Sequence, residues 1–109
     1  MKNPFLNKRV KKEAVVEKYL KKQVEKFGGQ IRKVEFPGHR GAPDRVILFP
    51  NKVLAWVELK RETEDLDVWQ EREHERLCDM GQIVGVVRRK IEVDRLVEEL
   101  YCESQRRAE

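Results

Sequence analysis

The sequence predicts a single α/β domain, in which a central mixed sheet of four strands is flanked by helices. Short apolar runs bounded by turn residues alternate along the chain with segments in which apolar residues recur at helical spacing. In one place a strand, a helix and a strand follow one another, which is the usual connection between parallel strands. At 109 residues the chain has the size of one domain, so any functional site should share one core with the fold.

The first elements expected are a helix over residues 11–27 and a strand over residues 30–36. In the helical segment the apolar residues fall on one face, and Gly28-Gly29 supplies a C-terminal stop. The strand segment alternates between two faces, one of which should be partly wet.

A hairpin follows, in which residues 44–49 and 53–60 flank the turn residues Pro50-Asn51-Lys52. Both of its faces are apolar, because the runs contain few polar residues at alternate positions. We therefore expect helices to cover both sides of the hairpin, which should lie at the centre of the sheet.

Beyond the hairpin, residues 66–80 predict a second helix that starts near Asp67, and residues 82–87 predict a fourth strand. This strand should lie parallel to the 53–60 strand, with a right-handed connection between them. Apolar residues at helical spacing over residues 93–101 then predict a C-terminal helix.

Composition limits the classes of function. Hydrophobic residues make up 39% of the chain, enough for a packed core, which we expect over about residues 11–101 between flexible tails at 1–10 and 103–109. Twenty-four Lys and Arg against 20 Asp and Glu weakly favour a polyanionic partner. Cys78 and Cys102 lack CxxC spacing, which argues against zinc and fits a reduced, cytoplasmic setting. No apolar stretch approaches the ~20 residues that span a bilayer, so neither a membrane partner nor export is expected.

Two acidic residues interrupt the apolar hairpin at one end. If the hairpin is symmetric about Asn51, opposed residues have numbers that total 102, so Asp44 faces Glu58. Like charges that are directly opposed are destabilising, and a cation should therefore lie between them. Lys60 is two residues beyond Glu58 and shares its strand face. Taken singly, each residue is more simply a turn acid or an exposed strand end, but their mutual register favours a site.

Two carboxylates and several waters are the usual ligands of magnesium in proteins. Next to such apolar runs, charged groups are costly unless they are satisfied. The residue pattern alone therefore predicts a divalent cation held by Asp44 and Glu58, with Lys60 beside it.

These residues also carry a family resemblance. Pro43-Asp44, thirteen intervening residues and Glu58-Leu59-Lys60 resemble the PD-(D/E)xK signature of restriction-endonuclease-like nucleases. More narrowly, the chain from about residue 13 to residue 100 resembles the VRR-NUC family. The matching elements are Val16-Glu17-Lys18-Tyr19-Leu20, Gly28-Gly29, Gly41-Ala42-Pro43-Asp44-Arg45, Val57-Glu58-Leu59-Lys60, Gln70, Gly81 and Val87-Arg88-Arg89.

The resemblance implies a restriction-endonuclease-like core and a Mg²⁺-dependent phosphodiesterase, with Mn²⁺ as a substitute, that leaves a 5′-phosphate. By that analogy Asp44, Glu58 and the backbone carbonyl of Leu59 hold the metal, while Lys60 orients water and offsets phosphate charge. Glu17 matches a helix-borne acid of the family and is a further catalytic residue and metal-ligand candidate; a surface ion pair with Lys21 is its simpler role.

Several other residues are weaker candidates. Gln70 matches a family glutamine and should contact the catalytic lysine or the scissile phosphate, although an isolated helix glutamine is more often solvated. Glu13, one turn before Glu17, is the alternative helix acid. His39 and Arg40 on a glycine-rich loop suit phosphate contact, and Arg45 and Arg61 complete the expected DNA-binding set. These four are DNA-contact candidates because of their charge and their place beside the acids. Trp56 and Trp69 are more often core residues than base-stacking platforms.

Three functions remain open from the sequence. The first is a metal-dependent DNA endonuclease, acting as a homodimer on branched or structured DNA such as junctions or flaps. The second is a non-catalytic nucleic-acid-binding module that retains the fold, whose mark would be a broken Asp, Glu, Lys set; here the set is whole. The third is an interaction domain with solvated charges, which would show no salt-dependent affinity for DNA.

Overall fold

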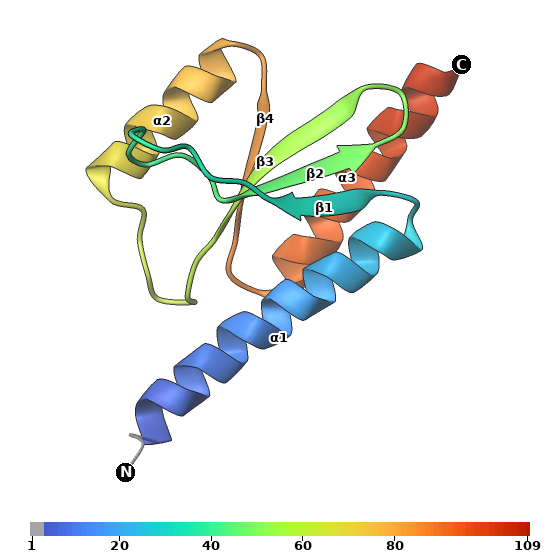
Figure 1. Ribbon diagram of the computed structural model, residues 1–109. Coiled ribbons are helices and arrows are strands. Elements are labelled where there is room, and N and C mark those ends of the chain that lie inside the picture. Colours follow the sequence, from blue (N-terminus) through green and yellow to red (C-terminus); the bar gives the residue numbers. More distant parts are fainter. Residues whose placement is uncertain (1–3) are drawn as a thin grey trace.

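The computed structural model describes the backbone of residues 4–109 and the side chains of residues 14–109. Helices and strands alternate in the described part as an α/β fold, which confirms the predicted class (Figure 1). In chain order the elements are α1 (Pro4–Lys26), β1 (Gln30–Lys33), β2 (Arg45–Phe49), β3 (Val53–Leu59), α2 (Val68–Asp79), β4 (Ile83–Val87) and α3 (Lys90–Ala108).

The strands form one mixed sheet in the order β1-β2-β3-β4. The first three strands are antiparallel, and β4 lies parallel to β3, as the strand, helix, strand pattern predicts. The β2–β3 register runs from Phe49↔Val53 to Arg45↔Val57, so each pair of numbers totals 102. Asn51 and Lys52 close this hairpin with positive φ angles of 66° and 64°, a region in which asparagine is common. The predicted symmetry about Asn51 is confirmed.

Residues at helix boundaries explain where α1 and α2 end. Gly28 has a φ of 91°, and the Gly29 N–H donates to the carbonyl of Val24 at 2.8 Å, which closes the C-terminus of α1. Asp67 is the N-cap of α2, and Gly81, with a φ of 79°, follows its end. The stops and starts expected from these residues are therefore confirmed.

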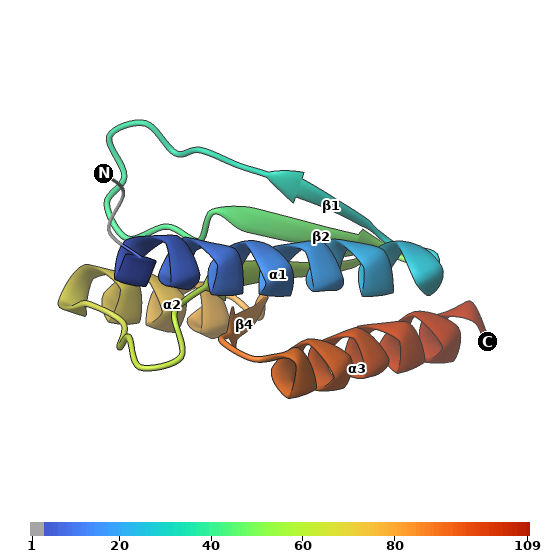
Figure 2. The same ribbon diagram turned by 90° about the horizontal axis from the view of Figure 1, so that it is seen from below.

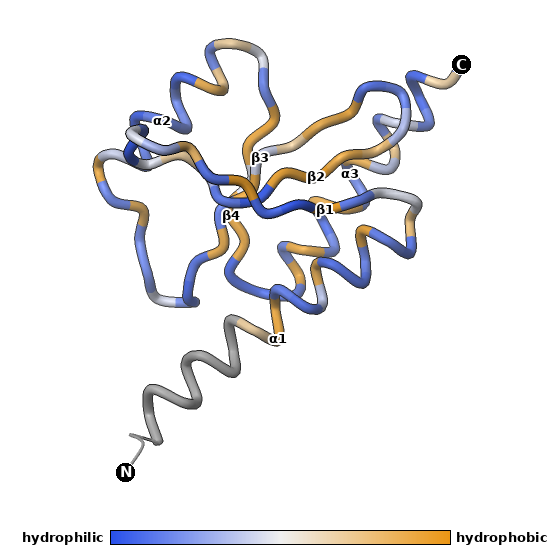
Figure 3. Tube along the Cα trace, viewed as in Figure 1, coloured by the Kyte–Doolittle hydropathy of each residue, from blue (hydrophilic) through white to orange (hydrophobic). Residues whose placement is uncertain are grey.

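The main core lies between the sheet and two helices. Figure 2 shows α1 and α3 side by side on one face of the sheet, and Figure 3 shows hydrophobic residues concentrated on β2, β3 and β4, whereas β1 is mostly hydrophilic. The tyrosine hydroxyl of Tyr19 in α1 donates to Asp94 in α3 at 2.6 Å, and the rings of Phe27 and Tyr101 lie 5.3 Å apart. The buried apolar residues of this core are Leu20, Val24, Ile47, Phe49, Val53, Ala55, Val57, Val87, Val93, Leu96, Val97 and Leu100.

The opposite face of the sheet is covered less completely than expected. Helix α2 packs mainly beside β4, and Leu48 of β2 is 38% exposed. Trp56 of β3 contacts the ring of Phe36 with 5.6 Å between centroids, and its indole N–H donates to Gln82 at 3.1 Å. The prediction that helices cover both faces of the hairpin therefore holds only in part, because a single short helix cannot span this face.

Both end helices extend beyond their expected limits. Helix α1 begins at Pro4, and α3 continues to Ala108, through segments expected to be tails. In α3 the reason is Ser104, which is 1% exposed: its hydroxyl donates to the Pro50 carbonyl at 2.8 Å. The Asn51 amide donates in turn to the Ser104 carbonyl at 2.8 Å. Polar contacts to the hairpin turn thus fix the last turns of α3, where no apolar period signals a helix.

Within the described residues, no helix is both long enough and apolar enough to cross a membrane.

Replacing Ser104 with Ala should destabilise the fold by about 1 kcal/mol, because the hydrogen bond between its buried hydroxyl and the Pro50 carbonyl is lost. Urea unfolding followed by circular dichroism measures this change. Glu98→Ala, at an exposed position of the same helix, is the control and should change stability by less than ~0.5 kcal/mol. Equal stabilities of the Ser104 and Glu98 variants would show that α3 is not fastened to the hairpin turn.

Candidate active site

Asp44 and Glu58 meet at the open end of the central hairpin. Asp44 directly precedes β2, and its backbone carbonyl accepts a hydrogen bond from the Val34 N–H at 2.9 Å. It lies one step beyond the last register pair, Arg45↔Val57, and therefore opposite Glu58 of β3. Glu58 is only 6% exposed. The structure thus brings together the two acids that hairpin symmetry pairs.

This pair has an unfavourable electrostatic environment. Burial, followed by the negative charge of Asp44, raises the pKa of Glu58 from 4.5 to about 7, and the positive charge of Lys60 opposes that rise. One carboxylate oxygen of Asp44, Oδ1, is buried and has no hydrogen-bond partner among the described residues. A buried acceptor without a donor is costly. The site therefore favours either a shared proton or an added cation.

Gln70 is fixed beside this pair by the first turn of α2. Its backbone N–H donates to Asp67 Oδ1 at 2.9 Å, and its side-chain Oε1 accepts from the Asp67 N–H at 3.0 Å, which makes a capping box. Its remaining amide group, Nε2, donates to Glu58 Oε1 at 3.0 Å. The sequence predicted Lys60 or a phosphate as its partner. In the structure its partner is Glu58 instead. The capping box occupies the backbone N–H and Oε1 of Gln70 and leaves Nε2 directed at Glu58.

Lys60 follows β3 and lies on the same strand face as Glu58. Its N–H donates to the carbonyl of Val87 at 3.0 Å, while Leu59 pairs with Val87 in the β3–β4 register. Its side chain is only 11% exposed, and Nζ lies 3.8 Å from Glu64 Oε2. The ammonium lies close enough to Glu58 for its charge to lower the pKa of that carboxyl, and its ion pair with Glu64 is long and weak.

Arg45 links the site to the first helix. Its guanidinium lies 2.5 Å from Glu17 Oε1 through one nitrogen and 3.0 Å from Asp44 Oδ2 through the other, and its side chain is 12% exposed. Glu17 therefore lies near Asp44, with the Arg45 guanidinium between the two carboxylates. Arg45, expected to contact DNA, instead bridges two acids in this structure. The side chain of Glu13, the alternative helix acid, lies outside the described residues.

The loop that leads into β2 packs on α2. His39 Nε2 pairs with Glu73, which is buried, and the guanidinium carbon of Arg40 lies 4.9 Å from the centroid of the Trp69 ring. Gly41 has a φ of 88°, and a Cβ there would lie 2.4 Å from the Trp69 carbonyl oxygen, so only glycine fits. His39 and Arg40 are thus placed on the α2 side of the site.

Arg61 directly follows Lys60, in the loop between β3 and α2. It is exposed, and its backbone N–H donates to Glu64 Oε1 at 3.3 Å.

The donor set at this centre suits a hard divalent cation. No three side chains among His, Cys, Asp and Glu converge on a common point within residues 14–109, so protein ligands would be few. Mg²⁺ accepts such a site because it retains several waters and needs only one or two carboxylates. Asp44 Oδ1, which has no hydrogen-bond partner in the described part of the chain, and the raised pKa of Glu58 both mark a place where a positive charge would relieve an existing cost.

Known proteins resemble the chain in sequence and in structure. A comparison with models of known protein families gives no match. The protein named Putative nuclease p44, of Acyrthosiphon pisum secondary endosymbiont phage 1, is 40% identical over 79 residues, which cover 72% of this chain and 85% of that protein. A solved structure described as a VRR_NUC domain matches 80% of this chain and 95% of its own, with 42% identity and a TM-score of 0.74.

The chain belongs to the VRR-NUC family of nuclease domains.

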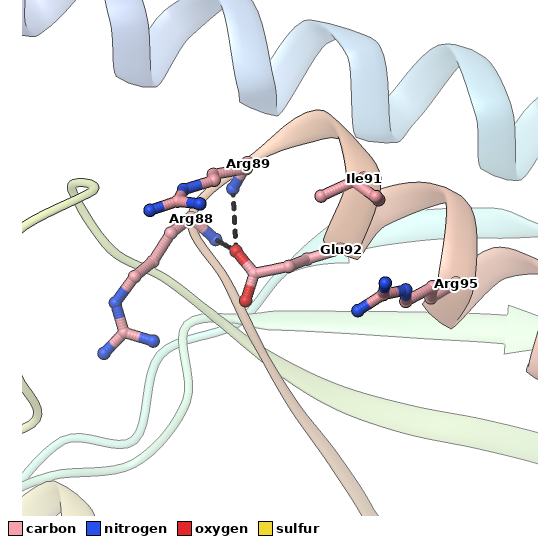
Figure 4. A pocket seen from close by; sticks show the side chains of 5 residues that line it. All are labelled: Arg88, Arg89, Ile91, Glu92 and Arg95. Carbon is pink, nitrogen blue, oxygen red and sulfur yellow. Dashed lines mark hydrogen bonds between the residues drawn. The ribbon is translucent and has the colours of Figure 1, made fainter.

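This VRR-NUC domain also has a basic pocket that sequence reasoning missed. Figure 4 shows Arg88, Arg89 and Arg95 around Glu92. The Glu92 Oε1 accepts hydrogen bonds from the backbone N–H groups of Arg88 and Arg89, each at 3.0 Å. The cavity has a volume of about 320 Å³, and its first lining residue, Arg88, follows Val87, whose carbonyl accepts the Lys60 N–H. The Arg88-Arg89 pair was visible in the sequence, but Arg95 joins it only because α3 begins at Lys90.

The raised pKa of Glu58 makes the metal-free VRR-NUC domain sensitive to pH. A carboxyl whose pKa is higher in the folded than in the unfolded state destabilises the fold progressively as pH rises, here from 4.5 through about 7. The free energy of unfolding of Glu58→Gln minus that of wild type should therefore be larger at about pH 8 than at about pH 5.5.

Urea unfolding of both proteins in a chelator at these two pH values measures the effect. Because the two chains share all other titratable groups, the change in their difference isolates Glu58. A difference in stability that does not depend on pH would contradict the environment described for this carboxyl.

Proposed function

We propose that this nuclease domain is a metal-dependent DNA endonuclease whose centre is formed by Asp44, Glu58 and Lys60. The observation that carries the proposal is the opposition of Asp44, whose Oδ1 is buried, to the buried Glu58, with the largely buried Lys60 beside them at the end of the central hairpin. Family membership supports phosphodiester hydrolysis as the reaction. The same residues fit the PD-(D/E)xK pattern.

In this proposal Asp44, Glu58 and the backbone carbonyl of Leu59 hold Mg²⁺, with Mn²⁺ as a substitute, and Glu17 is a further candidate ligand if Arg45 releases it. When bound, the ion supplies Lewis-acid polarisation of phosphate and water. The carboxylates supply the charge that attracts it. Burial strengthens this attraction, because screening by water is weaker there.

The remaining groups orient the reactants. Gln70 holds Glu58 Oε1 through a hydrogen bond of 3.0 Å and so fixes the direction of that carboxylate. The Lys60 ammonium shares a strand face with Glu58 and, unlike Arg45, bridges no pair of acids among the described residues, and it stabilises negative charge that grows on the phosphate. Its pairing with Glu64 at 3.8 Å is loose enough for a phosphate to compete for it.

DNA is the proposed substrate because basic groups surround this centre. The arginines of the pocket in Figure 4 follow Val87, whose carbonyl accepts the Lys60 N–H, and His39 and Arg40 contact α2. The chain carries a net charge of +4, which favours a polyanion. We further propose branched or structured DNA, such as junctions or flaps, because a domain of this size contacts a short segment and gains specificity from shape.

Separating metal binding from turnover tests the proposed centre. Asp44→Asn removes one of two anionic ligands and should abolish both Mn²⁺ binding in calorimetry and DNA cleavage. Lys60→Met should bind Mn²⁺ at least as tightly as wild type, because a nearby positive charge is lost, while turnover falls about 10²- to 10³-fold. Glu98→Gln, at an exposed position of α3, is the control and should match wild type in both assays.

Cleavage by Asp44→Asn, or near wild-type cleavage by Lys60→Met, would show that the catalytic centre is not at this end of the hairpin. Metal-independent DNA binding without cleavage by the wild-type chain would instead support a binding module that retains the fold. Cleavage of single-strand, duplex, flap and four-way-junction DNA, each with and without Mg²⁺, tests the substrate class.

A homodimer is the oligomeric state we propose. Pairing would let two centres act on one branched substrate, and the partly open face of the sheet at Leu48 offers apolar surface for it. Sedimentation at micromolar concentration should show twice the 13.0 kDa mass of one chain. A species of 13.0 kDa alone would contradict the dimer.

A further inference from the structure

Beside the candidate centre, α2 carries an exposed tryptophan flanked by two arginines. We propose that Trp69, Arg40 and Arg72 form a binding site for an unpaired nucleotide of the DNA substrate, with the base on the indole and its phosphates on the guanidiniums. The proposal rests on the proposed function and narrows it: strands with unpaired bases next to the cut are preferred over continuous duplex.

The exposure and surroundings of Trp69 are unusual for a tryptophan. Its side chain is 38% exposed, so the expectation of a core role is wrong for this residue. The guanidinium carbons of Arg40 and Arg72 lie 4.9 and 5.6 Å from the centroid of its ring. Neither guanidinium has a carboxylate or carbonyl partner among residues 14–109, whereas the neighbouring Arg76 is paired with Glu73. Two unneutralised arginines on one exposed aromatic ring suit an anionic, aromatic ligand.

The backbone that carries the Trp69 ring is fixed beside the candidate centre. Trp69 immediately precedes Gln70, whose side chain donates to Glu58. Its backbone carbonyl packs against Gly41, three residues before Asp44, at a distance that excludes any side chain. A nucleotide bound on Trp69 would therefore lie next to the position proposed for the scissile phosphate.

The chemistry of this cluster distinguishes unpaired from paired DNA. In a continuous duplex each base is already stacked on both sides, whereas a flap or a branch offers a free base face. An indole contributes to single-strand binding by stacking on any base, and arginine adds cation–π and phosphate contacts. The expected gain from such stacking is about 10- to 100-fold in affinity. The alternative is that Arg40 and Trp69 only fasten the loop, which would affect all substrates alike.

Equilibrium binding in a chelator tests the proposal without requiring cleavage. The probes are a flap DNA with 2-aminopurine at the first unpaired nucleotide and a continuous duplex of equal length. Trp69→Ala and Trp69→Leu should each lose about 10- to 100-fold in affinity for the flap but less than ~2-fold for the duplex. They should also lose the quenching of 2-aminopurine by the protein. Trp69→Phe, which retains an aromatic face, should keep most of both signals.

Two further variants sharpen the comparison. Arg72→Gln should weaken flap binding and reduce the salt dependence of binding by about one ionic contact. Tyr101→Ala removes an aromatic side chain of similar exposure, 36%, on α3, and should leave the flap-to-duplex ratio unchanged.

Equal losses of flap and duplex affinity in the Trp69 variants, or no quenching with the wild-type chain, would overturn the inference and assign Trp69 to loop packing alone. The outcome for the proposed function is separate, because it depends on Mg²⁺-dependent cleavage by the wild-type chain. Cleavage of both DNAs at equal rates would support the proposed endonuclease function and contradict the nucleotide site.

Discussion

The opposition of Asp44 and Glu58 is the constraint on which the rest of the site depends. The hairpin register places two carboxylates face to face, and the burial of Glu58 and of Asp44 Oδ1 removes water that would separate their charges. Each surrounding feature answers this repulsion in part: Arg45 pairs with Asp44, Gln70 donates to Glu58, and the charge of Lys60 lowers the pKa of Glu58. Since one oxygen of Asp44 still lacks a hydrogen-bond partner among residues 14–109, these groups do not compensate the pair fully.

The fold fastens this repulsive pair from several directions. The hairpin turn is tied to the last turns of α3 through Ser104 and Asn51, which keeps the register from slipping at the end away from the site. At the site itself, the loop before Asp44 packs on α2 through His39 and Gly41. Local repulsion is therefore balanced by contacts made elsewhere in a small core, as is common where a site stores unfavourable interactions.

The sequence predicted those features that depend on local spacing. The symmetry of the turn about Asn51 determined the Asp44–Glu58 pair, and the Asp67 cap located the start of α2. Contacts between distant segments were beyond its reach. The bridge from Arg45 to Glu17 spans 28 residues, and the burial of Ser104 depends on a turn 54 residues earlier. Nor could helical periodicity show that the Trp69 side chain lies at the surface, because an apolar residue in the first turn of a helix can face either way.

Gln70 illustrates how two demands can meet in one side chain. Its position in the capping box accepts only residues whose side chain can bond back to the N-cap, in practice glutamine or glutamate. Its contact with Glu58 requires a donor, and a glutamate there would instead add a third negative charge to the acids. Glutamine alone satisfies both, so the residue tolerance of this position is narrower than either the helix or the site would impose by itself. A substitution of Gln70 should accordingly be tolerated only together with a second substitution, at Asp67 or at Glu58.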